Sequence, residues 1–523
     1  MSTSTDNLPD IAQMTMSLAR RMDSANEIAP VCGRLMQVLA QGSVCLPLSS
    51  GETALMAKSP VVSVAPEHDG ILVLDGNRLY TRRNWQYEQA IKSRILAMAA
   101  APPSQKAAIP DNDVFASLNA LQRTAVESMC ENKLSLLTGG PGTGKTFTIA
   151  RAVKLALDQN PHLRIGLAAP TGKAAARVRD AMLAESHSLG LADNIAASTI
   201  HALLRPNRDW VTFKHNRNNP CLLDWLIVDE CSMLDLPLMA KLLDALPDSC
   251  RLTLVGDANQ LASVEPGHLF GDLSRMPRIP IVRLKESRRF PSDGEIYQLS
   301  EAVNAKNAEE TLRLLKRQGN AFVHYYPMTR DSMHAIWRGF RETASRLFGD
   351  FSRQTTPEGA LRAMNDCRIL CPFREGPCGV ASINRELQRI LGEKSPVPMM
   401  VTRNNSSLNV SNGDVGVVLP DRPGLLWLGT EDGAVRSIPR ALLLDTEPAF
   451  ASSIHKAQGS EFKDVIIVIP PYELSENARS LLTREILYTA LTRTKRQVFL
   501  YASDQSVTLC CTQETQRFSG LAT

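Results

Sequence analysis

Short apolar runs alternate with longer segments of helical periodicity through the middle of the chain. Four runs lie at residues 134–137, 165–169, 226–228 and 252–255, and helix-like segments separate them. A second block of this kind begins near Arg368 and ends with runs at 465–469 and 498–501. Such alternation is typical of parallel sheets covered by helices. The pattern therefore predicts an α/β protein with two parallel-sheet domains.

Two further regions break this alternation. Residues 395–449 carry short β-like runs separated by turn signals such as Asn412-Gly413-Asp414, which predict a small inserted β-barrel. Residues 1–105 combine helical spacing at 28–39 and 87–98 with a hairpin signal at 75–77, which predicts an α+β domain with a packing or docking role. The predicted domains are 1–105, 106–290, 291–394 with 450–523, and the insertion 395–449.

Composition narrows the class of protein without naming a partner. The chain has 523 residues and a net charge of +4, with 44% hydrophobic residues, which is ordinary for a soluble protein of several domains. So mild a charge neither supports nor excludes nucleic acid as a partner. No apolar run reaches the ~20 residues of a membrane span, and the polar N-terminus lacks a signal-peptide core, so we expect no membrane partner and a cytoplasmic location.

The 11 cysteines show no paired framework and are expected to be reduced thiols. Cys367, Cys371 and Cys378 form the one group that could supply thiolate ligands to zinc or an iron–sulfur cluster. Cys371, however, ends the apolar run 368–371, which favours simple burial. The metal site stays open as the alternative.

The strongest chemical signal is a phosphate-binding loop. It follows an apolar run, precedes a helix-like segment and reads Gly139-Gly140-Pro141-Gly142-Thr143-Gly144-Lys145-Thr146. Its glycines let successive backbone N–H groups face phosphate oxygens. Lys145 would contact the β- and γ-phosphates of ATP, and the Thr146 hydroxyl would bind Mg²⁺. The helix after the loop adds the positive end of its dipole.

An acidic pair and two arginines complete the predicted ATP site. Asp229 ends the apolar run 226–228 and would hold Mg²⁺, while Glu230 would polarise the attacking water. Phosphoryl transfer also needs positive charge near the γ-phosphate, for which Arg289 and Arg493 are candidates, one after each apolar block. Either arginine taken alone is as readily a surface residue. Together they predict nucleotide bound between two domains.

With these motifs in place, the chain resembles superfamily 1 DNA helicases, and among them the RecD family, the alpha subunit of exodeoxyribonuclease V (RecBCD). The resemblance rests on Gln122, on segments 169–177, 198–201, 254–264 and 453–462, and on 370–377, 403–405 and 412–416 in the second block. It implies two RecA-like motor domains, with Gln122 reading adenine and Gln260 sensing the γ-phosphate. Segments 44–48 and 76–80 resemble the N-terminal domain that docks on RecC in this family.

The same resemblance implies an ATP-dependent helicase that moves 5′→3′ on single-stranded DNA and acts at double-strand ends with RecB-like and RecC-like subunits. Three alternatives stay open: a regulatory subunit with an ATP-dependent switch, a stand-alone RecD-like helicase, and a nuclease. No carboxylate–lysine cluster typical of a two-metal nuclease is visible in the sequence. Residues 1–105 also lack the helix-hairpin-helix features of stand-alone relatives, and residues 272–284 lack an insertion that some relatives carry.

Hydroxyl, amide and cationic side chains near the expected ends of the strands are candidates for gripping the DNA backbone, and one aromatic ring for stacking on a base. The alternative interpretation for each residue is a surface side chain that contacts only solvent. The candidates are Thr171, Lys173, Arg177, Thr199, His201, Phe373, Arg374, Asn412, His455 and Lys456.

Overall fold

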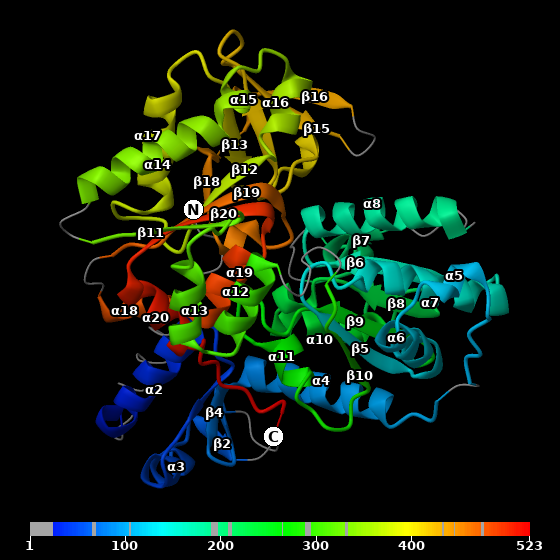
Figure 1. Cartoon of the computed structure of the whole chain (residues 1–523). Helices are drawn as coiled ribbons and strands as arrows, with labels where there is room; N and C mark the ends of the chain where they lie inside the picture. Colours follow the sequence, from blue (N-terminus) through cyan, green and yellow to red (C-terminus); the bar gives the residue numbers. More distant parts are fainter. Residues whose placement is uncertain are drawn as a thin grey trace.

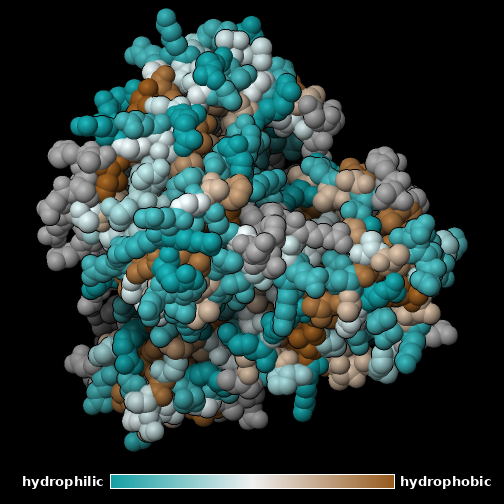
Figure 2. Space-filling view, in the orientation of Figure 1, coloured by the Kyte–Doolittle hydropathy of each residue, from teal (hydrophilic) through white to brown (hydrophobic). Residues whose placement is uncertain are grey.

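A computed structural model of the chain places two sheet-containing lobes beside each other, with the N-terminal region below them (Figure 1). The structure describes residues 25–64, 70–103, 106–189, 197–207, 212–263, 265–287, 294–329, 333–430, 434–443, 445–471 and 475–522. The face in Figure 2 is mostly hydrophilic and is hollowed where the upper lobe meets the lobe on the right. Among the described helices, none combines the length and apolar character needed to cross a membrane.

The first core is a six-stranded parallel sheet in the order β10-β5-β9-β8-β6-β7. Its central strands are buried on both faces, which is why their sequences are almost continuously apolar. The strands are β5 (Leu134–Gly139), β6 (Ile165–Ala169), β7 (Ala197–Thr199), β8 (Trp225–Val228), β9 (Arg251–Gly256) and β10 (Ile281–Leu284). The four predicted apolar runs are therefore confirmed as strands.

Helices cover both faces of this sheet (Figure 1). They are α5 (Asp113–Ala116), α6 (Ala120–Glu131), α7 (Lys145–Gln159), α8 (Gly172–Leu189), α9 (Ile200–Leu204), α10 (Leu236–Ala245) and α11 (Leu269–Leu273), with the 3₁₀ turn η1 (Cys231–Met233). Separate hydrophobic clusters lie above and below the strands. This layered packing fixes the carboxyl ends of β5, β8 and β9 along one edge, where the candidate ATP residues follow.

The second core is a five-stranded parallel sheet in the order β11-β20-β19-β12-β18. Its strands are β11 (Val323–Pro327), β12 (Cys367–Cys371), β18 (Ala451–Ser453), β19 (Phe462–Val468) and β20 (Thr494–Ala502). Its helices are α12 (Glu295–Asn304), α13 (Ala308–Leu315), α14 (Met333–Leu347), α15 (Gly349–Ser352), α16 (Pro357–Ala363), α17 (Val380–Leu391), α18 (Glu476–Arg479), α19 (Arg484–Leu491) and α20 (Asp504–Thr512), with η4 (His455–Ala457). The second α/β domain is confirmed, and β11 adds an edge strand upstream of the predicted block.

The insertion in the second core is one antiparallel sheet in the order β16-β15-β14-β13-β17. Its elements are β13 (Val397–Val401), η2 (Ser406–Leu408), β14 (Val415–Val418), β15 (Leu425–Gly429), β16 (Val435–Pro439), η3 (Arg440–Leu442) and β17 (Thr446–Pro448). An inserted antiparallel β-domain is therefore confirmed. Closure into a barrel is not seen, because β16 and β17 stand at opposite edges without a pairing between them in the described residues.

The N-terminal region is α+β, with a sheet in the order β1-β4-β3-β2. Gly76 takes φ +60° in the tight turn between β3 and β4, as the predicted hairpin requires. The elements are α2 (Ala25–Ala40), β1 (Cys45–Pro47), α3 (Ser50–Ala57), β2 (Val62–Val64), β3 (Leu72–Asp75), β4 (Arg78–Thr81) and α4 (Arg82–Ala99). The helix α4 begins five residues before the predicted 87 because Thr81 caps it.

This region does not pack as a separate unit. Helix α4 lies against α10 of the first core, and both contribute to one hydrophobic cluster. The C-terminal residues 513–522 run back from the second core to the same place, beside α4 and β4 in Figure 1. There the Phe518 carbonyl accepts hydrogen bonds from Val44 N at 2.8 Å and Cys45 N at 3.3 Å, and Leu521 is buried. The predicted linker after residue 99 thus joins two parts that share a core.

Candidate ATP site and nucleic-acid face

The phosphate-binding loop links the end of β5 to the start of α7. Gly142 and Gly144 take φ values of +77° and +82°, which favour glycine. A Cβ on Gly144 would also lie 2.7 Å from Gln122 Nε2. Lys145 Nζ donates to the carbonyls of Gly139 at 2.7 Å and Gly140 at 3.1 Å. The loop thus holds its lysine across the concave side where phosphates would bind.

The acidic pair follows β8 in a turn with a strained backbone. Glu230 takes φ +54°, an uncommon conformation for a residue with a side chain, and its N–H donates to Asp229 Oδ1 at 2.7 Å. Asp229 is buried. Its burial, and to a smaller extent the negative charge of Glu230, raise its pKa to about 6, while the positive charge of Lys145 acts in the opposite direction. Two carboxylates and one lysine are therefore packed together beside the loop.

A cavity of about 350 Å³ lies over these groups, and both cores line it. The first core contributes the loop, the acidic pair, Gln260 and one face of α8, and the second core contributes Glu461 and Arg493. Its full lining is Pro141, Gly142, Gly144, Lys145, Thr146, Phe147, Ala174, Arg177, Val178, Ala181, Asp229, Glu230, Gln260, Glu461 and Arg493. Lys145, Thr146, Asp229, Glu230 and Gln260 of the first core thus meet Arg493 of the second in one cleft, called the ATP cleft below. Of the other predicted nucleotide residues, Gly139, Gly140 and Thr143 line the cavity on the other side of the loop.

Arg493 enters this cleft from the end of α19. It is buried, and its Nε donates to the Thr489 carbonyl at 3.1 Å and its Nη1 to that of Ser460 at 3.4 Å. Burial lowers its pKa, and the charge of Glu230 opposes this. These carbonyls hold the guanidinium toward the cleft. The other predicted arginine, Arg289, lies outside the described residues.

Arg177 lines the ATP cleft. Its guanidinium forms an ion pair with Glu461 of the second core and lies 4.0 Å from Glu230 Oε1. Two carboxylates therefore hold it beside the nucleotide residues, about one turn after Lys173 on α8. Contact between Arg177 and DNA stays a prediction.

The segment 257–261 after β9 connects the two cores. Asp257 is buried and accepts hydrogen bonds from Tyr488 Oη at 2.9 Å and Gln260 Nε2 at 3.1 Å. The next hydrogen bonds run through Leu261, whose N–H donates to Thr489 Oγ1 at 2.9 Å and whose carbonyl accepts from Gln458 Nε2 at 2.5 Å. The predicted γ-phosphate sensor thus lies in a segment held by second-core side chains.

Gln122 is part of the loop's support. Its Oε1 accepts from Asn119 N at 3.1 Å in a capping box at the start of α6, and its Nε2 donates to the Thr143 carbonyl at 3.5 Å. Gln122 is also buried. The residue therefore joins α6 to the phosphate-binding loop, and its reading of adenine stays a prediction.

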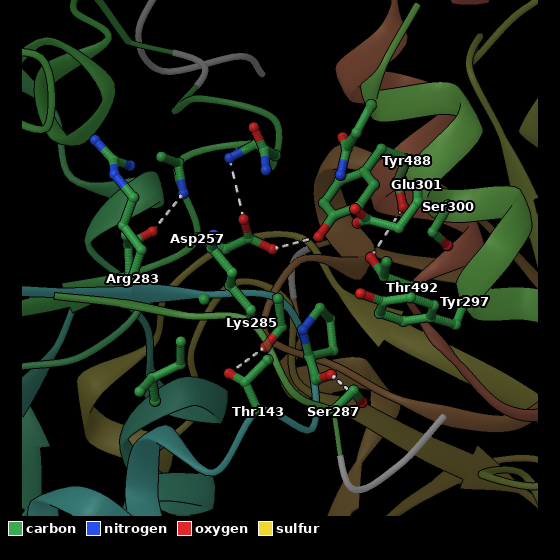
Figure 3. Close-up of a pocket in the computed structure, with 18 residues that line it drawn as sticks. Thr143, Asp257, Arg283, Lys285, Ser287, Tyr297, Ser300, Glu301, Tyr488 and Thr492 are labelled. Atoms are coloured by element: carbon green, nitrogen blue, oxygen red, sulfur yellow. Dashed lines mark hydrogen bonds between the residues drawn. The ribbon is translucent and has the colours of Figure 1, made fainter. Parts of the chain in front are cut away.

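A second cavity, of about 380 Å³, lies on the opposite side of the loop (Figure 3). Gly139, Gly140 and Asp257 line it from the first core, and Tyr297 and Tyr488 from the second. Sequence reasoning missed this space and the role of Tyr488. The available signal was the position of Tyr488 in α19, five residues before Arg493, which follows the end of that helix.

The hydroxyl candidates on the first core act as helix caps. Thr171 Oγ1 accepts from Ala174 N at 3.3 Å at the start of α8, and Thr199 Oγ1 accepts from Ala202 N at 3.0 Å at the start of α9. His201 is exposed, with its ring centroid 5.9 Å from that of Phe213. These residues stand at the carboxyl ends of β6 and β7, so their contact with DNA stays a prediction.

The second-core candidates are organised by a carboxylate that the sequence did not reveal. Glu447 in β17 accepts from Arg374 Nη2 at 2.9 Å and from Lys456 Nζ at 2.8 Å. Lys173 of the first core lies near Lys456: burial chiefly lowers the pKa of Lys173 to about 8, the charges of Arg368 and Lys456 add to this, and Asp414 opposes it. Glu447 thus holds Arg374 and Lys456, and Lys173 approaches Lys456 where the cores and the insertion meet.

The remaining DNA candidates differ in exposure. Asn412 is exposed in a turn where Gly413 takes φ +95°, and its N–H donates to Asn404 Oδ1 at 2.7 Å. Phe373 is partly buried against the hydrophobic core of the second sheet, and its stacking on a base stays a prediction. Burial, with the charge of Arg517, lowers the pKa of His455 to about 4, so this side chain is neutral near pH 7 and offers no cation to phosphate.

Cys367, Cys371 and Cys378 are buried in one hydrophobic cluster. Burial raises the pKa of the Cys367 and Cys371 thiols. In the parts of the chain that the structure describes, no three His, Cys, Asp or Glu side chains are placed to hold a metal ion. The favoured interpretation, buried thiols in the core, agrees with this packing.

Comparisons with known proteins agree with this arrangement. Residues 122–266 match the family model described as "AAA domain", and residues 448–501 match "UvrD-like helicase C-terminal domain". The chain is 35% identical to the RecBCD enzyme subunit RecD of Mycolicibacterium smegmatis over 98% of this chain and 95% of that protein. It is 30% identical to the Haemophilus influenzae subunit RecD, over 91% of this chain and 84% of that protein. The ATP-dependent RecD2 DNA helicase of Deinococcus radiodurans is 30% identical over 81% of this chain but only 55% of its own length.

Proposed function

This chain belongs to the RecD family of superfamily 1 DNA helicases, and from that premise we propose that it is an ATP-driven 5′→3′ translocase and helicase on single-stranded DNA. One observation carries the proposal. The ATP cleft is assembled from both cores, with Lys145, Asp229 and Glu230 on one wall and Glu461 and Arg493 on the other. A nucleotide bound there would touch both walls, so binding and hydrolysis would change how the cores sit together.

The side chains suit the hydrolysis of a nucleoside triphosphate. Lys145 would exchange its loop carbonyls for phosphate oxygens, and Glu230 would orient the attacking water. Thr146 and Asp229 are oxygen donors of the kind Mg²⁺ takes, and the buried, raised-pKa carboxylate of Asp229 is a group that a cation would stabilise in its charged form. When bound, the metal supplies positive charge to the phosphate oxygens. Arg493, and Arg289 by its place in the sequence, would stabilise the charge that develops in the transition state.

Coupling to DNA would pass through the segment 257–261 and the group around Glu447. The segment 257–261 is bonded to the second core, and Glu447 pairs with Arg374 and Lys456 of the second core, close to Lys173 of the first. Closing the cleft would therefore change the spacing of the cations that face the strand. Alternating grip by two cores, with one strand of DNA across them, gives directional movement.

We further propose that the chain works as one subunit of a complex with RecB-like and RecC-like chains at double-strand DNA ends in recombinational repair, with nuclease activity in a partner. The extent of the similarity favours this over a stand-alone helicase. The match covers nearly all of a RecBCD subunit but little more than half of the RecD2 helicase. A purely regulatory subunit is the second candidate, and it would need no productive hydrolysis.

A variant of the loop lysine separates these functions. Lys145→Gln is expected to abolish DNA-stimulated ATP hydrolysis and unwinding of a 5′-tailed duplex, because the β- and γ-phosphates lose their cation. Assembly with partner subunits should persist, as assessed by co-purification. Unwinding by Lys145→Gln at the wild-type rate would overturn the helicase proposal. A wild-type chain without DNA-stimulated hydrolysis would favour the regulatory one.

A further inference from the structure

Tyr488 reaches from the second core into the first. It lies in α19, five residues before Arg493, and it is almost fully buried, at 3% exposed. Its hydroxyl donates to Asp257 Oδ2 at 2.9 Å, and a Cβ on Gly140 would lie only 3.1 Å from the hydroxyl oxygen. Figure 3 shows the ring reaching across the cavity toward Asp257. The hydroxyl therefore stands between the phosphate-binding loop and the segment 257–261.

The hydroxyl is one link in a chain of hydrogen bonds across the boundary between the cores. The side chain of Asn304, at the end of α12 in the second core, lies beside this hydroxyl in the same cavity. On the other side, Asp257 accepts from Gln260 Nε2 at 3.1 Å and from Asn259 N at 3.0 Å. Gln260 in turn lines the ATP cleft. A second-core group is thus connected to the cleft through Asp257.

The hydrogen bond between Tyr488 and Asp257 is buried, so losing it costs free energy that water cannot restore. Asp257 is 3% exposed, and water would not readily replace a donor lost there. Burial raises the pKa of Asp257. The charge of Lys145 is the largest influence that lowers it, and the hydrogen bonds from Asn259, Tyr488 and Gln260 lower it further. The carboxylate therefore depends on donors from both cores to stay charged beside Lys145.

We propose that Tyr488 is a positioning residue for ATP hydrolysis. Its hydroxyl holds Asp257, and through Asp257 the amide of Gln260, in place only while the two cores are together. The inference rests on the proposed function, and it adds a mechanism by which the second core sets the geometry of the first core's γ-phosphate side. Separation of the cores withdraws the hydroxyl and releases Asp257 and Gln260 together.

The test is Tyr488→Phe in the full-length chain, with Tyr501→Phe as the matched control. Tyr501 is equally buried in the second core, and its hydroxyl donates to Thr343 Oγ1 at 3.0 Å, away from the cleft. Tyr488→Phe is expected to lower the kcat of DNA-stimulated ATP hydrolysis about tenfold, equivalent to about 1.4 kcal/mol, and to leave the KM for ATP within twofold. Tyr501→Phe should change neither constant by more than twofold.

A double-mutant cycle then shows whether the hydroxyl acts through Asp257. In an Asp257→Asn background, Tyr488→Phe should reduce kcat by less than twofold further, because its acceptor has already been altered. A full tenfold effect in that background, or a Tyr488→Phe enzyme as active as Tyr501→Phe, would overturn the inference. Should Tyr488→Phe fail to fold, Asn304→Ala keeps the ring and hydroxyl and is expected to lower kcat about threefold. Wild-type kcat in that folded variant would overturn the inference too.

The outcomes also keep the two proposals apart. Absence of DNA-stimulated hydrolysis in the wild-type chain would overturn the proposed function. Normal wild-type hydrolysis with an unimpaired Tyr488→Phe chain would overturn only the positioning role.

Discussion

The ATP cleft and the nucleic-acid face are both built from charged side chains, but they use charge in opposite ways. In the cleft, Asp229 is buried beside Glu230, and burial together with the charge of Glu230 raises the pKa of Asp229 to about 6. On the nucleic-acid face, Arg374 and Lys456 share one carboxylate, Glu447, at ordinary ion-pair distances. The cleft holds a local charge imbalance, two adjacent carboxylates, that a bound cation would relieve. The face pairs two cations with a single carboxylate, so DNA phosphates would compete with an internal partner for them.

The largest expected effect is the loss of the buried arginine of the cleft. Arg493→Ala should reduce DNA-stimulated ATPase kcat about a thousandfold, because its positive charge is placed where transition-state charge develops. ATP binding, followed with a fluorescent analogue, should weaken far less. The exposed Arg389 in α17 gives the control, Arg389→Ala, for which wild-type kcat is expected. A similar loss in both variants would mean that the second core does not contribute to hydrolysis through Arg493.

The second effect tests the charge imbalance through stability. Because the folded-state pKa of Asp229 lies above 3.8, the folded chain holds this proton more tightly than the unfolded chain, and stability falls as pH rises from about 4 to about 6. Asp229→Asn should therefore stabilise the nucleotide-free chain at pH 7.5, by at most about 3 kcal/mol, and by little at pH 4.5. Chemical denaturation at both pH values measures this difference.

The control for that measurement has the opposite sign. Asp224 has its pKa lowered to about 2, chiefly by the hydrogen bond from Arg164, so Asp224→Asn should reduce stability at pH 7.5. Should Asp229→Asn destabilise the chain at pH 7.5 as Asp224→Asn does, the cleft would hold no charge imbalance.

The third effect decides to which region Arg177 belongs. Arg177→Ala removes a cation that pairs with Glu461 and approaches Glu230 in the ATP cleft, so the KM for ATP should rise about tenfold, or about 1.4 kcal/mol. Single-stranded DNA affinity should stay within twofold. Arg179→Ala on the same helix serves as the control. The opposite pattern, weak DNA binding with an unchanged KM, would return Arg177 to the nucleic-acid face.

The smallest effect concerns the candidate nucleic-acid face. Glu447→Gln frees Arg374 and Lys456, so single-stranded DNA should bind about three- to fivefold more tightly at low salt. The salt dependence should steepen by about 0.7 for each cation that gains a phosphate. Fluorescence anisotropy at several salt concentrations measures both. Glu386 also pairs with two arginines, Arg341 and Arg389, so Glu386→Gln is a matched control that should leave DNA affinity unchanged. Unchanged affinity in Glu447→Gln would remove this group from the DNA path.

The same contrast explains what the sequence could predict. Lys145, Asp229 and Arg493 were identifiable because phosphate chemistry demands particular residue types at fixed positions after strands. The strands around them were visible as well, since burial on both faces leaves continuous apolar runs. Glu447 and Tyr488 were not identifiable, because each has a partner far away in the sequence: Arg374 is 73 positions from Glu447, and Asp257 is 231 positions from Tyr488.

Cationic candidates for DNA contact were harder to assign, and for a physical reason. A lysine or arginine at the end of a strand serves DNA, a nucleotide or an internal carboxylate equally well until the fold places its neighbours. Arg177 has Glu461 as its neighbour, and His455 has Arg517. Neither neighbour is near it in sequence, so composition and spacing held no information about these two roles.

The return of the chain's C-terminal residues to the N-terminal region has a consequence for how the protein is made. Phe518 N donates to Ser43 Oγ across 475 positions, and Leu521 completes a cluster that also holds residues of β1, α4 and α10. On a ribosome, that cluster stays unfinished until nearly the whole chain has emerged, and such long-range closure slows folding. The region that resembles a partner-docking domain would therefore reach its final form only after both motor cores are synthesised.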